Sequence, residues 1–246
     1  RAAESRARVL FLYLSGLDHY LHFNVHDAAG VTDRLAWYEA GLRRVWEAAR
    51  GARGDVRMFV FSDHGMTPVR WTYDLGRDVA ALGLRVPGDY LAAYDSTMAR
   101  FWVWSPRARR ALGELLADHP CGQLLDQAEL SRLGVWFDDD RYYHLLFLMK
   151  PGMLLCPSHM GAIRFAGMHG YHPSEPTADA VLLASLPVDR GVDHITHVHD
   201  VLLEDVGIPR HEAAGAEAPA RADGIPPRPL GLAPASDRTP PGAPAA

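Results

Sequence analysis

The chain has 246 residues, of which 48% are hydrophobic and 22% are charged, and its formal net charge is -5. This length allows one large domain or two small ones with a buried core, and the negative charge excludes a strongly basic nucleic-acid-binding protein. No apolar run approaches the roughly 18 residues of a membrane-spanning helix. Cys121 and Cys156 form no CxxC motif, so they are interpreted as buried thiols, with one disulfide as the alternative.

The first third of the chain predicts a strand–helix–strand unit. Residues 9–14 form a continuous apolar run, which is typical of a strand covered on both faces of a parallel sheet. Apolar residues then recur every three or four positions over residues 35–49, behind the capping side chains of Thr32 and Asp33, and predict an amphipathic helix. Residues 57–61 are expected to form the next strand. Because parallel strands need such a crossover, the predicted fold class is α/β, with a mostly parallel central sheet flanked by helices.

The later elements are less regular. Further strands are expected at residues 99–104, 142–149, 161–166 and 180–186, and further helices at residues 107–118, 127–133 and 196–206, the last stopped by Gly207 and Pro209. The region 71–160 is interpreted as a less regular insertion in a domain that extends over residues 1–210. Residues 211–246 are rich in Ala, Pro and Gly without periodicity, and are predicted to be a disordered tail.

Two Asp–His pairs follow the first two predicted strands. Asp18 and His22 are four residues apart, which places both side chains on one face of a helical turn. Asp63 and His64 follow the strand at residues 57–61, and Gly65 beside them removes side-chain bulk and permits an unusual backbone angle. Parallel strands end at one edge of a sheet, where α/β sheets bind ligands, so both pairs are expected to converge there. The spacing of Asp18 and His22 alone is common by chance, and Asp63-His64 at a strand end is a better signal. Together the two pairs favour a site for zinc, manganese or iron.

A third segment, Gly-Met-His-Gly-Tyr-His-Pro at residues 167–173, places His169 next to a glycine on a loop. Such a histidine is more typical of a ligand than of core packing, and His169 is therefore the expected fifth ligand. His159 and His172 are weaker candidates for substrate contact. His197 and His199 are two residues apart and point to different faces of a helix, so a capping or surface role is favoured over a metal site.

These segments resemble the alkaline phosphatase superfamily, in its type I phosphodiesterase / nucleotide pyrophosphatase branch. The resemblance rests on Asp18-x-x-x-His22, on Ser-Asp-His-Gly-Met at residues 62–66, on Met-His-Gly-Tyr at residues 168–171 and on residues 95–102, and it covers residues 9–209. It implies two divalent metal ions, usually zinc, with Mn²⁺ or Fe as alternatives. Asp18, His22 and His169 match the ligands of one metal, and Asp63 and His64 match two ligands of the other.

The resemblance also implies a further Asp ligand and a Thr or Ser nucleophile, both from a segment before the strand expected at residues 9–14. Only eight residues precede that strand. The chain is therefore expected to be a fragment whose nucleophile lies upstream of Arg1, and no catalytic residue is assigned within it. Thr67 is the nearest hydroxyl to Asp63 and His64, but Pro68 follows it and a role in a turn is favoured.

The function that these residues favour is hydrolysis of phosphodiester or nucleotide pyrophosphate bonds in a small phosphate-ester substrate. Alternatives within the superfamily are a phosphomonoesterase, a sulfatase or a phosphonate hydrolase, since the metal ligands do not separate these reactions. A non-catalytic metal-binding domain is the alternative outside enzymes. The sequence does not define the oligomeric state. The compartment stays open between an exported or periplasmic location and a cytoplasmic one. No nucleic-acid-binding surface and no membrane span are expected.

Overall fold

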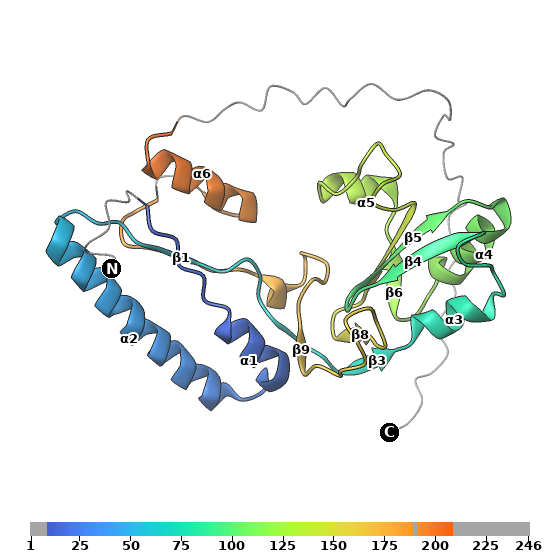
Figure 1. Ribbon diagram of the computed structural model, residues 1–246, viewed down its shortest axis with the longest axis horizontal. Coiled ribbons are helices and arrows are strands. Elements are labelled where there is room, and N and C mark those ends of the chain that lie inside the picture. Colours follow the sequence, from blue (N-terminus) through green and yellow to red (C-terminus); the bar gives the residue numbers. More distant parts are fainter. Residues whose placement is uncertain (1–8, 189–190, 209–246) are drawn as a thin grey trace. The chain divides into compact units, whose positions relative to one another are not determined.

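The computed structural model describes residues 9–188 and 191–208 (Figure 1). The helices are α1 (Gly16–Asn24), α2 (Ala28–Arg53), α3 (Leu75–Ala81), α4 (Pro106–Ala117), α5 (Gln127–Arg132) and α6 (Ile195–Asp205), with a short 3-10 helix at Pro176–Ala178. The strands are β1 (Phe59–Phe61), β2 (Thr67–Pro68), β3 (Trp71–Tyr73), β4 (Tyr90–Tyr94), β5 (Met98–Val103), β6 (Gly122–Leu124), β7 (Leu145–Met149), β8 (Met153–Leu155), β9 (Gly167–Met168) and β10 (Leu182–Ala184). The chain divides into two units after Val201, and only residues 202–208 of the second unit are described.

Most strands of the described chain pair antiparallel. Strands β4, β5, β7 and β6 form, in that order, an antiparallel sheet. Strand β1 pairs with β10 and β2 with β9, both antiparallel, whereas β3 and β8 form a parallel pair. The α/β class is confirmed, but the predicted mostly parallel central sheet is wrong for the described residues, whose sheets are small and mixed.

The predicted parallel unit is absent from the described residues because its first strand does not form. Residues 9–14 have no regular secondary structure, and their side chains are 49–80% exposed. An apolar run becomes a strand only where a neighbouring strand supplies hydrogen bonds, and β1 pairs instead with β10, with Val60 opposite Leu183. The ring of Phe11 lies 6.3 Å from that of Phe61, so the run passes beside β1 without pairing with it.

Most other predicted elements occur close to their expected bounds, as β5, β7, β10, α4, α5 and α6. Residues 161–166 are an exception, because they form only an isolated bridge between Ser158 and Gly161, where the φ of Gly161 is 110°. Both cysteines are free thiols, so the disulfide alternative is wrong. Pro209 and the predicted tail at residues 211–246 lie outside the described residues. Of the helices in the described ranges, none is long and apolar enough to cross a membrane.

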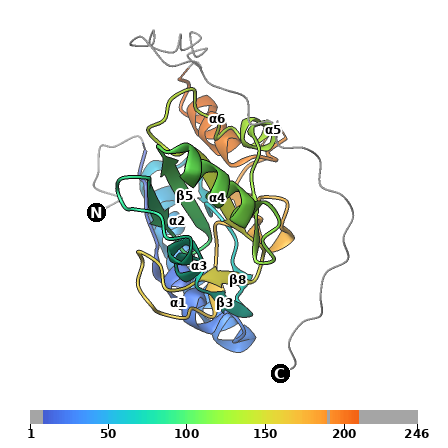
Figure 2. The same ribbon diagram turned by 90° about the vertical axis from the view of Figure 1, so that its right-hand side faces the viewer.

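Strand β7 lies at the centre of the core and is buried on both faces. On one face Phe147 belongs to the larger apolar cluster, together with Leu112 of α4, the helix in front of the sheet in Figure 2. On the other face Leu146 and Leu148 pack with Leu130 of α5. The alternation of a strand thus divides one apolar run between two clusters, and it fixes α5 on the face of β7 that lies opposite the larger cluster.

Helix α2 begins earlier than predicted. Its N-cap is Asp27, whose side chain accepts a hydrogen bond from the backbone N–H of Gly30 at 3.0 Å. Thr32, one of the predicted capping residues, donates its hydroxyl hydrogen to the carbonyl oxygen of Ala28 within the helix. Asp27 also accepts a hydrogen bond from the Tyr20 hydroxyl at 2.7 Å, so the cap links α2 to α1.

We expect Asp27→Ala to lower the free energy of unfolding by about 1 kcal/mol, because the N–H of Gly30 then loses its acceptor. Urea denaturation measures this change. Asp33→Ala is the matched control, since Asp33 lies inside α2 and is not its cap, and a change within about 0.5 kcal/mol is expected there. Equal losses in both variants would contradict the assignment of Asp27 as the cap.

Candidate metal centre

Three segments of the chain meet at one place. Helix α1 carries Asp18, the loop after β1 carries His64, and His169 directly follows β9. One ligand atom from each of these three side chains lies within 4.8 Å of the other two. Among the described residues, these three form the one group of metal-ligating side chains that meets this criterion.

Pairing between β2 and β9 brings the two loops together. Thr67 lies opposite Met168, so the segments that carry His64 and His169 leave this short ladder side by side. Helix α1 packs against β9, and the carbonyl oxygen of His22 accepts a hydrogen bond from the N–H of Ala166 at 2.8 Å. The convergence therefore arises from an antiparallel pair and a helix contact, whereas the sequence predicted a shared edge of a parallel sheet.

Gly167 permits the close approach of α1 to β9. A Cβ atom at this position would lie 2.7 Å from the carbonyl oxygen of Leu21, closer than real Cβ contacts allow. Any other residue would push the helix that carries Asp18 and His22 away from the strand that precedes His169. The sequence contained this glycine in the quoted motif but gave no indication of which segment packs against it.

The carboxylate of Asp18 faces two histidine rings but forms no hydrogen bond with either of them through Oδ1. Its Oδ1 atom lies 3.5 Å from Nε2 of His22 and 3.7 Å from Nε2 of His169. This oxygen is buried and has no hydrogen-bond partner among the described residues. A buried acceptor without a partner costs about 1–3 kcal/mol, and a cation bound among these atoms would remove that cost. The residues present therefore fit a divalent metal.

Two of the histidines present Nε2 as a free acceptor. Nδ1 of His22 lies 2.9 Å from the carbonyl oxygen of Gly167, and Nδ1 of His64 lies 2.8 Å from that of Gly65. A carbonyl oxygen only accepts, so Nδ1 donates in both rings and each neutral imidazole keeps its lone pair on Nε2. Metal-binding histidines are typically oriented in this way, with the second ring nitrogen donating to a backbone carbonyl.

His169 is held in the neutral form that binds metals. Burial lowers the pKa of its imidazole, and the neighbouring rings of His64 and His22 lower it further, against the opposing charge of Asp18. Its ring stacks on that of His64, with centroids 3.7 Å apart and planes 19° from parallel. A positive charge on His169 would be repelled by one on His64 at this distance, so the stack favours the neutral form of His169.

Asp63 lies at the margin of the cluster. Its Oδ1 atom is 3.5 Å from Nε2 of His64, but its side chain is 79% exposed and it is not part of the group of three. The resemblance implies that His64 and Asp63 bind one metal, and that Asp18, His22 and His169 bind the other. The ring of His64 lies directly against that of His169, because the loops that carry them are joined through β2 and β9.

Gly65 allows a backbone segment to pass beside His64. Its N–H donates to the carbonyl oxygen of Ala178 at 2.9 Å, and a Cβ atom there would lie 2.3 Å from the carbonyl oxygen of Thr177. The predicted removal of bulk is thus the reason for this glycine, whereas the unusual backbone angle is not found, since its φ is not positive. Thr67 lies in β2, not in a turn, with its Oγ1 2.7 Å from that of Thr177.

Other predicted candidates lie elsewhere. Nδ1 of His197 lies 3.0 Å from Oδ1 of Asp193, close to the start of α6. Sequence reasoning missed Thr97, whose hydroxyl donates to the carbonyl oxygen of Gly170 beside His169 at 3.0 Å. Thr97 belongs to the segment 95–102 quoted for the resemblance, so a local signal existed but its contact did not follow from the sequence.

Solved structures identify the class of fold. Murine ectonucleotide pyrophosphatase / phosphodiesterase 5 matches with a TM-score of 0.58 and 20% identity, covering 71% of this chain and 46% of that chain. An inactive form of the murine protein in complex with AMP gives the same values. The human protein gives a TM-score of 0.56 and 17% identity, covering 70% of this chain and 46% of that chain. The fold is therefore alkaline phosphatase-like, and the chain spans less than half the length of these proteins.

The sequence identifies the family within that class. The family model for type I phosphodiesterase / nucleotide pyrophosphatase matches residues 1–171. The chain therefore belongs to the type I phosphodiesterase / nucleotide pyrophosphatase family. The match includes all five predicted ligands and the segment at residues 95–102. A comparison with curated proteins gave no match.

Proposed function

We propose that this chain is part of a metal-dependent hydrolase of phosphodiester or nucleotide pyrophosphate bonds. The observation that carries the proposal is the buried Oδ1 atom of Asp18, which has no hydrogen-bond partner and lies in a group with ligand atoms of His64 and His169. Membership of the family supports the reaction class. The AMP complex of the murine protein supports a nucleotide-containing substrate.

The proposed ligands are Asp18, His22, Asp63, His64 and His169, and the proposed ions are two divalent metals, zinc before manganese or iron. Such ions, when bound, act as Lewis acids toward the oxygens of a phosphoryl group. The nucleophile expected from the resemblance, a Thr or Ser upstream of Arg1, is part of the same proposal.

The chain's own residues set the charge and orientation of the centre. Two carboxylates and three neutral imidazoles do not cancel the charge of two divalent ions. The loaded centre would therefore be positively charged, which suits an anionic phosphate ester. The carbonyl oxygens of Gly167 and Gly65 fix the ring orientations of His22 and His64. The stack of His64 on His169 keeps the two rings close together. Backbone carbonyls and the ring stack thus support the ligand geometry.

Metal analysis after exhaustive dialysis tests the ligand set. The wild-type chain is expected to retain a transition metal, and Asp63→Ala and His169→Ala are each expected to lower the retained amount. His26→Ala is the matched control, because His26 is an exposed histidine close to α1 and is not a proposed ligand. Absence of bound metal in the wild type, or full retention in both ligand variants, would overturn the proposal.

Side-by-side assays of a phosphodiester, a phosphomonoester and a sulfate ester test the reaction. They are made on the chain with its upstream coding sequence restored, so that the expected nucleophile is present. The phosphodiester is expected to be hydrolysed fastest. A preference for the monoester or the sulfate would favour another reaction of the superfamily, and hydrolysis of none of them would favour a non-catalytic metal-binding domain.

A further inference from the structure

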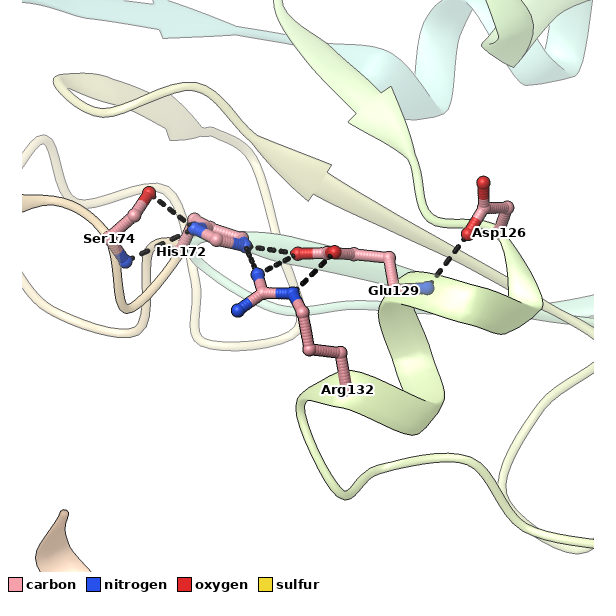
Figure 3. Close-up of polar contacts among 5 residues, drawn as sticks. All are labelled: Asp126, Glu129, Arg132, His172 and Ser174. Carbon is pink, nitrogen blue, oxygen red and sulfur yellow. Dashed lines mark hydrogen bonds and ion pairs between the residues drawn. The ribbon is translucent and has the colours of Figure 1, made fainter.

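His172, three positions after His169, is held by a network of polar contacts (Figure 3). Its Nε2 atom lies 2.6 Å from Oε1 of Glu129, and its Nδ1 atom accepts a hydrogen bond from the N–H of Ser174 at 3.1 Å. Because Nδ1 accepts, the neutral ring carries its hydrogen on Nε2 and donates it to the carboxylate. Both ring nitrogens of His172 therefore have partners.

Glu129 is itself fixed from two sides. Both of its carboxylate oxygens accept hydrogen bonds from the guanidinium of Arg132, one of them at 2.9 Å from Nε. The side chain of Asp126 caps the backbone N–H of Glu129 at 2.8 Å. The bonds from Arg132 and then from His172 lower the pKa of Glu129 to about 2. A bidentate pair of this kind sets the direction of the carboxylate as well as its charge.

Helix α5 gives this network a rigid support. Leu130, next to Glu129 in the sequence, is 3% exposed and packs with Leu146 and Leu148 of β7. The Glu129 carboxylate is thus tied to the central strand of the core. Glu129 and His172 are 43 residues apart in the sequence, so their contact joins the loop after His169 to a separate part of the fold.

The loop that carries His169 is anchored at each of the next three positions. The Thr97 hydroxyl donates to the carbonyl oxygen of Gly170, and a φ of 85° at Gly170 turns the chain there. Tyr171 is 5% exposed, and its hydroxyl donates to the carbonyl oxygen of Met153 at 3.0 Å. His172 closes the series on Glu129. Only the last of these three anchors joins two side chains, which are 17% and 27% exposed.

We propose that Glu129 and His172 are positioning residues for His169, and this inference rests on the function proposed above. Their contact fixes the loop at its exposed end and so holds the His169 ring in the orientation that places Nε2 toward Asp18. We call Glu129, Arg132 and His172 the loop clamp. Without the clamp the segment after Tyr171 gains conformational freedom, and ordering it again opposes metal binding.

The test compares zinc dissociation constants of the full chain, measured by competition with a chelator, for alanine and isosteric variants. Glu129→Ala is expected to raise the dissociation constant about tenfold, the lower end of the effect of residues that orient metal ligands. Glu129→Gln keeps an oxygen that accepts from Nε2 of His172, and His172→Gln keeps an N–H that donates to Glu129. Both glutamine variants are expected to recover most of the affinity lost in the corresponding alanine variants.

Glu114→Ala is the control, because Glu114 also pairs with an arginine of its own helix, Arg110 on α4, but this pair is exposed and lies away from the loop. It is expected to leave zinc affinity unchanged. The visible absorption of bound Co²⁺ reports the ligand geometry, and it is expected to change in Glu129→Ala and to return in Glu129→Gln. This recovery distinguishes positioning from a general loss of stability, which the urea curve of each variant monitors.

Unchanged zinc affinity in both Glu129→Ala and His172→Ala would overturn the inference, as would equal losses in the alanine and glutamine variants. His172→Ala removes the same contact from the loop side and leaves the pair of Glu129 with Arg132 on α5 in place, so it decides the question if Glu129→Ala does not fold. The ligand variant Asp18→Asn is measured in parallel. If it loses zinc while the clamp variants keep it, only the clamp is wrong; if the wild type binds no zinc, the proposed function is wrong as well.

Discussion

Asp18→Asn is expected to remove tight metal binding while leaving the metal-free protein folded. The Oδ1 atom of Asp18 is the buried acceptor that faces Nε2 of both His22 and His169. An amide has the same shape as the carboxylate but no charge. It therefore repels the lone pairs of the neighbouring histidine nitrogens less, and it attracts a cation far less. We expect the zinc dissociation constant to rise more than about 100-fold, beyond the effect of residues that only orient ligands.

The same substitution is expected to have opposite effects on stability with and without metal. At a zinc concentration near 1,000 times the wild-type dissociation constant, binding contributes about 4 kcal/mol to stability, and a 100-fold weaker site loses about 2.7 kcal/mol of it. Without metal, Asp18→Asn relieves a carboxylate without a partner, so the variant is expected to be at least as stable as the wild type. Urea denaturation with zinc and with chelator at pH 8 measures both effects.

Asp33→Asn is the control for this prediction, because it removes one carboxylate from α2, where no metal ligand is proposed. Zinc is expected to stabilise this variant as much as the wild type. If Asp18→Asn instead destabilises the protein equally with and without zinc, Asp18 has a structural role and the carboxylate does not bind metal.

The candidate ligands could be found from the sequence because their signals are local. The spacing of Asp18 and His22 fits one helical turn, and α1 does form over them. Asp63 and His64 follow a strand at residues 59–61 that was expected there. The reason offered for their convergence was wrong, because residues 9–14 do not pair and β1 is antiparallel to β10. A two-residue ladder between β2 and β9 has no periodicity to detect, yet it brings the loops together.

Contacts between distant residues explain the rest. The choice of cap for α2 failed because Asp27, Thr32 and Asp33 all have suitable side chains, and the hydroxyl of Tyr20 adds a bond to Asp27 that no spacing rule includes. The pairing of Glu129 with His172 depends on how α5 packs on β7, which a sequence pattern does not specify. Local patterns thus indicated the candidate ligands, whereas long-range packing decides which side chains meet.

Gly65→Ala is expected to disrupt the candidate metal centre by moving the backbone. The added Cβ would lie 2.3 Å from the carbonyl oxygen of Thr177 and 2.7 Å from that of Asp179, and both of these are main-chain atoms that cannot rotate away. The opposing segment is also held in place, because the N–H of Ser62 donates to Val181 at 3.0 Å and the N–H of Val181 donates back to the Ser62 hydroxyl. The chain must therefore move at residues 64–65, which shifts His64.

This shift has two measurable consequences. Overpacking of this kind lowers the free energy of unfolding by about 1–3 kcal/mol, and the displaced His64 is expected to raise the zinc dissociation constant at least about tenfold, comparable to the loss of a residue that orients a metal ligand. Gly113→Ala provides the control, because nothing lies within 4 Å of the added Cβ on α4. Alanine in a helix interior is favoured over glycine by about 1 kcal/mol, so Gly113→Ala is expected to stabilise the protein with zinc affinity unchanged. Were Gly65→Ala to keep wild-type zinc affinity despite the clash, His64 would not depend on this backbone contact, and its position in the cluster would have to come from its stack on His169 alone.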